Sequence, residues 1–245
     1  MKLIKKLLSV FLVISSFLSS SSFVKAHEFI LCEGFTSEIL PPKIKDLVNC
    51  NSSINDDRND FIKIDDLRYL KIKYWGFDQK EHNDGEMLVN KDIAKEVLEI
   101  FKELYDNQFP IQQIKLVEHY NSIDEDSMFD NNTSAFRLAD CSLKSKKPWH
   151  ALGLAIDINP MMNPCIYPNS SEPNPKFVPH NAENFLDRSE IKPGMITNNE
   201  SNNTCYNAFT EKGWEWGGNW DDPVDLHHFQ KYTWTTEFPR AYKNK

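Results

Sequence analysis

Two short motifs in the second half of the chain combine residue types that can hold a metal ion. In the first, HALGLAID at 150–157, a loop histidine stands seven residues before an aspartate in an apolar run. A carboxylate in apolar surroundings is costly unless a cation compensates its charge, so Asp157 needs a partner. The motif therefore indicates a metal site. The alternative is an aspartate that caps the turn at 159–160 and an unrelated surface histidine.

The second motif, DLHHFQ at 225–230, places an acid three residues before His228. An acid at this spacing can lie beside a metal bound by the histidine and take a proton from water. Two histidines and one aspartate leave the fourth position of zinc open, as in catalytic sites. Neighbours on an extended chain point to opposite faces, so His227 and His228 are alternatives as ligand.

A framework of strands and helices must bring these motifs together. Apolar and basic residues alternate over 69–74, which predicts a half-buried strand, and Asn83-Asp84-Gly85 predicts a turn. Asn90 can cap a helix whose apolar residues recur at three- and four-residue steps from Ile93 to Leu104, before Phe109-Pro110 ends it. Further strands are predicted at 111–117, 153–158 and 228–230, with mostly loop over 159–203. This mixed order favours an α+β fold with a small, mostly antiparallel sheet and flanking helices.

The start of the chain reads as a secretory signal peptide. A basic beginning, a short apolar run over 7–18 and Val24-Lys25-Ala26 predict cleavage after Ala26. We therefore expect export to the periplasm or the exterior. The apolar run is shorter than the ~20 residues that span a bilayer, so no membrane span is expected in the mature form. The organisation predicted is a signal peptide at 1–26, a polar extension outside the core at 27–65 and a catalytic domain at 66–238.

The net charge of the chain narrows the classes of molecule that it could bind. Loss of the four lysines of the signal peptide takes the net charge from −8 to −12, which argues against nucleic acid as a partner.

Five cysteines in an exported chain predict disulfide bonds, and an odd number leaves at least one without a bond. The pairs expected are Cys32 with Cys50 and Cys165 with Cys205, since each would close a loop-like segment.

The two motifs, HxxGxAxD and DxxHF, resemble those of the VanY-like zinc metallopeptidases of bacteria and phages. That family comprises D-alanyl-D-alanine carboxypeptidases and L-alanyl-D-glutamate endopeptidases. The resemblance extends over roughly residues 66–235, through GEMLVN at 85–90, NTSAF at 132–136, IDINP at 156–160, Asp187-Arg188 and PGMI at 193–196.

The resemblance implies a role for each residue of the two motifs. His150, Asp157 and His228 would bind Zn²⁺, and Asp225 would be the general base and later the acid. His228 is the implied ligand because it has the acid three residues before it and Phe229 after it, so His227 would lie behind the site or at the surface. The implied fold is the one shared with hedgehog signalling domains.

Three positions depart from the family pattern. Pro148 stands where the family often has serine, and Asn219 stands where it commonly has aspartate. Ala139 occupies the position of the family's substrate-binding arginine, and Arg137, two residues earlier, is the nearest candidate for that role. These departures affect substrate choice more than the type of reaction.

The function that the resemblance implies is hydrolysis of a peptide bond in the stem peptide of bacterial peptidoglycan by metal-activated water. Either the terminal D-Ala-D-Ala bond or the internal L-Ala-D-Glu bond could be cut. The alternative from another class is a domain of the same fold that contains zinc and binds wall peptide or a partner without cutting it.

Overall fold

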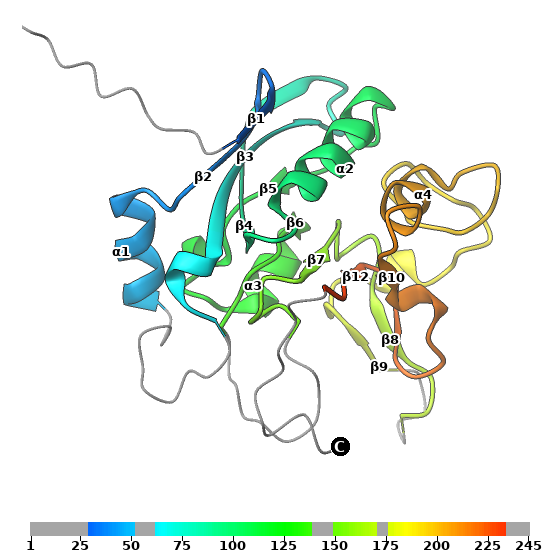
Figure 1. The fold of residues 1–245 in the computed structure, drawn as a ribbon. Coiled ribbons are helices and arrows are strands. Elements are labelled where there is room, and N and C mark those ends of the chain that lie inside the picture. Colours follow the sequence, from blue (N-terminus) through cyan, green and yellow to red (C-terminus); the bar gives the residue numbers. More distant parts are fainter. Residues whose placement is uncertain (1–28, 52–61, 139–148, 171–175, 234–245) are drawn as a thin grey trace, which may run out of the picture.

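The computed structural model describes residues 29–51, 62–138, 149–170 and 176–233 (Figure 1). The predicted signal peptide, Ala139, Cys141 and Pro148 lie outside these residues. Within these ranges, no helix is both long enough and apolar enough to cross a membrane.

The largest sheet has four antiparallel strands in the order β1 (Phe29–Cys32), β2 (Phe35–Glu38), β3 (Leu67–Trp75) and β4 (Glu81–Asn90). The strand expected at 69–74 is therefore confirmed as part of β3. Helix α2 (Ala94–Asp106) packs on β2 and β3 and buries Val97, Ile100, Phe101 and Leu104, which recur at helical spacing (Figure 1). The predicted helix is thus confirmed, and it supplies the main core together with this sheet.

The segment before β3 is not packed outside the core, contrary to expectation. Strand β2 pairs with β3 along its length, and Phe35 is buried in the main hydrophobic cluster. Helix α1 (Pro42–Asn51) and the 3-10 helix η1 (Ile64–Asp66) follow, with Ile44 and Val48 of α1 in a second apolar cluster beside Leu67. Strands of four residues are too short for the periodic signal that marks β3, which is why they were missed.

Two predicted boundaries near β4 also differ. Asn83-Asp84-Gly85 lies within β4, and the chain reverses at 76–80 instead. Gly85 permits close strand pairing, because a Cβ there would lie 2.3 Å from the carbonyl oxygen of Ile72. Asn90 ends β4 and accepts a hydrogen bond from the backbone N–H of Asp92 at 3.1 Å, so it opens a turn before α2 and does not cap it.

A short parallel pair and two small elements connect α2 to the first motif. The pair consists of β5 (Gln113–Ile114) and β6 (Asn132–Thr133), so the strand expected at 111–117 is shorter than predicted. Between them lie η2 (Val117–Tyr120) and α3 (Asp124–Phe129). This connection places α3 next to the motif residues, as described below.

Two further sheets of three strands form the other side of the molecule (Figure 1). One has the order β10 (Glu215–Trp216), β12 (His228–Gln230), β7 (Ala155–Asp157). The other has the order β11 (Val224–Asp225), β8 (Cys165–Tyr167), β9 (Lys176–Val178). The remaining elements are η3 (Glu183–Phe185), α4 (Thr204–Thr210) and η4 (Gly217–Asn219).

The α+β class is confirmed, with four α-helices among the described residues and several small, mostly antiparallel sheets in place of one. The strand at 228–230 is confirmed, and the one expected at 153–158 is reduced to β7. One core cluster joins both sides of the molecule. It contains Phe101 of α2, Phe209 of α4 and Phe229 of β12, and the rings of Phe209 and Phe229 stack with centroids 4.1 Å apart.

Neither predicted disulfide, Cys32–Cys50 or Cys165–Cys205, is formed. Cys32 ends β1, whereas Cys50 is exposed near the end of α1. Cys205 is buried in the main core on α4, whereas Cys165 lies on β8, paired with β9 and β11. The pairing prediction was wrong because short separation along the chain does not bring two residues together once each belongs to a different element.

Candidate metal centre

The pairing of β7 with β12 joins the two motifs. The strands are antiparallel, with His228 opposite Asp157 and Phe229 opposite Ile156. Side chains alternate along a strand, so Phe229 and Ile156 enter the core while His228 and Asp157 lie together on the other face. Residues 71 positions apart in the sequence thereby become neighbours.

His150 reaches the same place from a tight turn. The backbone N–H of Gly153 donates to the carbonyl of His150 at 2.9 Å, and Gly153 has a φ of 65°, a left-handed conformation that glycine adopts without strain. A Cβ on Gly153 would lie 2.6 Å from the backbone nitrogen of Asn90. The glycine of the first motif therefore lets the turn pack closely against the end of β4 and directs His150 toward β7.

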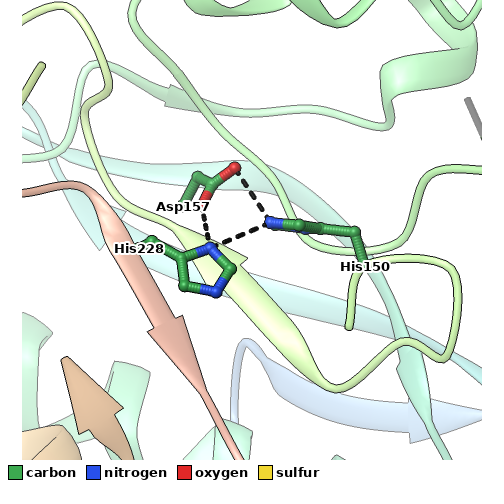
Figure 2. Close-up of side chains that lie close together, drawn as sticks. All are labelled: His150, Asp157 and His228. Atoms are coloured by element: carbon green, nitrogen blue, oxygen red, sulfur yellow. Dashed lines mark hydrogen bonds and ion pairs between the residues drawn. The ribbon is translucent and has the colours of Figure 1, made fainter. Parts of the chain in front are cut away.

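Three side-chain atoms converge at this point (Figure 2). His150 Nε2 lies 3.2 Å from Asp157 Oδ2, His228 Nδ1 lies 3.0 Å from Asp157 Oδ1, and the two nitrogens are 3.1 Å apart. Within the described ranges, this is the group of histidine, cysteine and acidic side chains whose ligand atoms lie close enough to share a metal ion.

The hydrogen bonds of the two imidazoles leave the converging atoms available as ligands. His150 Nδ1 lies 2.6 Å from the carbonyl oxygen of Ala135, which can only accept, so Nδ1 carries the proton and Nε2 keeps its lone pair. His228 Nε2 lies 3.2 Å from Gln230 Oε1, on the side away from the cluster. Metal-binding histidines usually donate their other N–H in this way. The donor set therefore fits a divalent transition metal.

The electrostatics of the cluster favour an ionised carboxylate. Burial alone would raise the pKa of Asp157, but the neighbouring His150, His227 and His228 imidazoles hold it well below its usual value. Burial and the nearby Arg137 guanidinium lower the pKa of His150. Burial also acts to lower the pKa of His228, but its contacts with Asp157 and Gln230 and the negative charges of Asp157 and Asp225 together outweigh this and raise it. Asp157 is thus ionised and His150 neutral near pH 7, the states in which both bind metals.

Arg137 lies at the edge of the cluster. Its Nη1 is 2.9 Å from Asp157 Oδ2 and 2.8 Å from Asp124 Oδ1 at the start of α3, and one fifth of its side chain is exposed. The guanidinium therefore faces Asp157 of the cluster and is not directed to solvent. Asp124, which was not singled out from the sequence, shares this cation with Asp157.

Asp225 pairs with His227, and His227 in turn lies beside Asp157 of the cluster. Asp225 Oδ1 lies 3.0 Å from His227 Nε2, and the Asp225 side chain is largely buried. His227 Nδ1 lies 2.8 Å from the carbonyl oxygen of Asn163, and its Nε2 is 3.9 Å from Asp157 Oδ1. Of the two positions left open for His227, the structure has the buried one, since only 5% of this residue is exposed. It is not among the three side chains that converge.

Other contacts to the cluster were not found from the sequence. Gln230 contacts His228, and Glu215 contacts Gln230 through Gln230 Nε2 at 2.8 Å. The spacing of His228 and Gln230 on one strand face was a usable signal for the first contact. Nothing local in the sequence places Glu215 beside Gln230, because that contact depends on the pairing of β10 with β12.

Three protein ligands of this kind are typical of the metal site of a hydrolytic enzyme. Residues 144–231 match the family model described as D-alanyl-D-alanine carboxypeptidase, which confirms over this segment the resemblance that the two motifs predicted. The match includes the three converging residues and Asp225, and it does not include Arg137. It supports assignment to the peptidases. Comparisons with curated proteins and with solved structures gave no match.

Proposed function

We propose that the protein is a zinc peptidase that hydrolyses a peptide bond in the stem peptide of bacterial peptidoglycan. The observation that carries the proposal is the convergence of His150, Asp157 and His228 within a segment that matches a carboxypeptidase family. The same match supports a cell-wall peptide as substrate. We further propose the hedgehog-like peptidase fold for residues 66–238 and export of the protein, in keeping with a wall substrate.

In the proposed reaction, His150 Nε2, His228 Nδ1 and one oxygen of Asp157 would hold the metal. A bound Zn²⁺ would polarise the scissile carbonyl and make water a nucleophile near pH 7. Asp225 takes a proton from the attacking water and passes it to the leaving amine. Support for this role comes from its largely buried carboxylate, which lies 3.0 Å from His227 Nε2 and is not among the three converging side chains.

Arg137 is the proposed binding group for the substrate carboxylate or carbonyl. Its guanidinium has several N–H donors in a fixed plane, and it already contacts Asp157 at the cluster through Nη1. A donor left over from the bonds to Asp157 and Asp124 could meet a peptide carboxylate beside the metal. This position would select substrates that carry a negative charge near the bond that is cut.

The test is digestion of purified peptidoglycan, with mass analysis of the released fragments, with and without a chelator. Loss of a terminal alanine would identify a carboxypeptidase, and release of whole stem peptides would identify an endopeptidase. The chelator should abolish either product, and added Zn²⁺ should restore it. Zinc bound in stoichiometric amount without any fragment released would instead favour the non-catalytic binding domain.

Two variants separate the ligands from the base. His150→Ala should lose both zinc and hydrolysis, because it removes a ligand. Asp225→Ala should keep zinc and lose activity by about 10²- to 10⁴-fold, the usual effect of a general acid-base group. Asp221→Ala, at an exposed position four residues earlier, before β11, is the matched control and should resemble the wild type. Equal loss of zinc in the first two variants would make Asp225 a ligand and refute the assignment.

A further inference from the structure

We infer that Glu215 and Gln230 form a hydrogen-bond chain of fixed direction that determines which nitrogen of His228 faces the metal. Glu215 would thus be a positioning residue, acting through Gln230 and not on the substrate. The inference rests on the proposed metal site and extends it to residues outside the cluster.

The chain has four members in sequence of contact. Trp220 Nε1 donates to Glu215 Oε1 at 2.6 Å, and Gln230 Nε2 donates to Glu215 Oε2 at 2.8 Å. Gln230 Oε1 then lies 3.2 Å from His228 Nε2, and His228 Nδ1 faces Asp157 and His150. Every contact between the indole and the cluster is therefore within hydrogen-bond distance.

The carboxylate of Glu215 sets the direction of the contacts that follow it. An ionised carboxylate can only accept hydrogen bonds, so the NH₂ group of Gln230 must face Glu215. The amide oxygen of Gln230 then faces His228, and because it too can only accept, His228 Nε2 must carry a proton. With Nε2 protonated in this way, Nδ1 is the nitrogen whose lone pair is available for a metal.

The sheet holds the members in place. Gln230 pairs with Glu215 across the β10–β12 ladder, and His228 and Gln230 are two residues apart on one face of β12. On the opposite face, Trp216 and Phe229 pair within the main core. The tight turn of η4 returns the chain so that the Trp220 ring lies beside His228, with centroids 5.5 Å apart.

Replacing the carboxylate of Glu215 with an amide would no longer fix the direction of the hydrogen bonds between Glu215, Gln230 and His228. In Glu215→Gln, the new side chain can donate as well as accept, so the Gln230 amide is free to turn over. Its NH₂ group would then face His228 Nε2 and favour the proton on Nδ1, where it competes with the metal. Loss of an outer partner of a metal-bound histidine typically weakens metal binding by about 10- to 100-fold.

The experiment measures the affinity of the full chain for Zn²⁺ by competition with a chromophoric chelator. Glu215→Gln should bind Zn²⁺ about 10- to 100-fold more weakly than the wild type. Glu211→Gln is the matched control, because it makes the same change at an exposed position four residues earlier, and it should bind like the wild type. Unchanged affinity in Glu215→Gln would overturn the inference.

A double variant tests direction apart from any general loss of packing. Glu215→Gln combined with Gln230→Glu exchanges the carboxylate and the amide, so His228 Nε2 again faces a group that can only accept. Zinc affinity should return close to the wild-type value. Affinity as low as in the single variant would show that Glu215 contributes in another way and would overturn the inference.

Nuclear magnetic resonance gives a readout that does not depend on activity. In the zinc-loaded wild type, ¹⁵N-labelled His228 should carry a proton on Nε2 and bind metal through Nδ1. Metal bound to Nε2 would refute the inferred direction of the hydrogen bonds from Glu215 to His228. If the wild type binds no zinc, the proposed function fails; if it binds zinc with equal affinity in Glu215→Gln, only the role of Glu215 fails.

Discussion

Two carboxylates of this protein are buried to almost the same degree and have opposite ionisation behaviour. Asp157 in β7 is 1% exposed and Glu118 in η2 is 3% exposed. Burial raises the pKa of Glu118 to about 7, and a backbone hydrogen bond offsets only part of that effect. Burial also acts to raise the pKa of Asp157, yet that pKa lies well below its usual value.

The difference lies in what surrounds Asp157. Its two oxygens lie within 4 Å of the Arg137 guanidinium and of three imidazoles, those of His150, His227 and His228. Nearby cations and hydrogen-bond donors stabilise the charged form more than burial destabilises it. A buried acid therefore marks a functional site when such groups face it, and burial by itself is insufficient evidence.

The largest expected effect comes from removing the charge at Asp157. Asp157→Asn weakens a direct ligand, so its affinity for zinc should fall by more than the roughly 10- to 100-fold that loss of an outer partner causes. Hydrolysis should fall with it. Zinc content and peptidoglycan digestion measure both losses. Glu118→Gln, which removes an equally buried carboxylate elsewhere, should keep both; a similar loss in the two variants would remove the distinction between the sites.

A smaller effect is expected from Arg137→Lys. Lysine keeps the charge beside Asp157 but lacks the planar set of donors, so the variant should keep zinc and lose about 10- to 100-fold in kcat/KM, roughly one hydrogen bond to a charged group. Steady-state kinetics with a stem peptide, alongside zinc content, tests this. Arg68→Lys on β3 serves as control. Loss of zinc in Arg137→Lys would mean that the arginine acts through Asp157 and not on substrate.

The smallest effect concerns stability at Glu118. The folded state binds the Glu118 proton more tightly than the unfolded state, whose carboxyl has a pKa near 4.5. Protonation therefore stabilises the fold below about pH 4.5, and this contribution is lost as pH rises toward 7. From pH 5 to pH 8, Glu118→Gln should gain about 1 to 3 kcal/mol in unfolding free energy relative to the wild type.

Chemical denaturation of both proteins at pH 5 and pH 8 measures that gain. Glu183→Gln, which replaces an exposed glutamate in another 3-10 helix, is the matched control. A difference between wild type and Glu118→Gln that stays constant from pH 5 to pH 8 would contradict the raised pKa.

The parts of the fold with strong local patterns were predictable from the sequence. The alternation in β3 and the apolar stripe of α2 each extend over enough residues to be recognised. The prediction of a turn at Asn83-Asp84-Gly85 was wrong, because Gly85 lies within a strand and allows close pairing with Ile72. Pairing between strands determined the conformation of these residues, and local residue preferences carry no information about that pairing.

The same distinction applies to the candidate site. His150, Asp157 and His228 belong to two compact motifs, and their convergence followed from spacing and resemblance. Asp124 and Glu215 were missed, because each reaches the site through the pairing or packing of another element. Residues that hold others in place depend on the assembled fold, so the local sequence does not identify them.

The antiparallel register of β7 and β12 has a consequence for folding. His150 and Asp157 are close in sequence, but His228 is 71 residues beyond Asp157, and closing so long a segment has an entropic cost in the unfolded chain. The complete set of ligands therefore exists only in the native state. A metal bound by all three would add about 2.7 kcal/mol of stability at a free concentration 100 times its dissociation constant. Removal of the metal would then lower the melting temperature as well as stop the reaction.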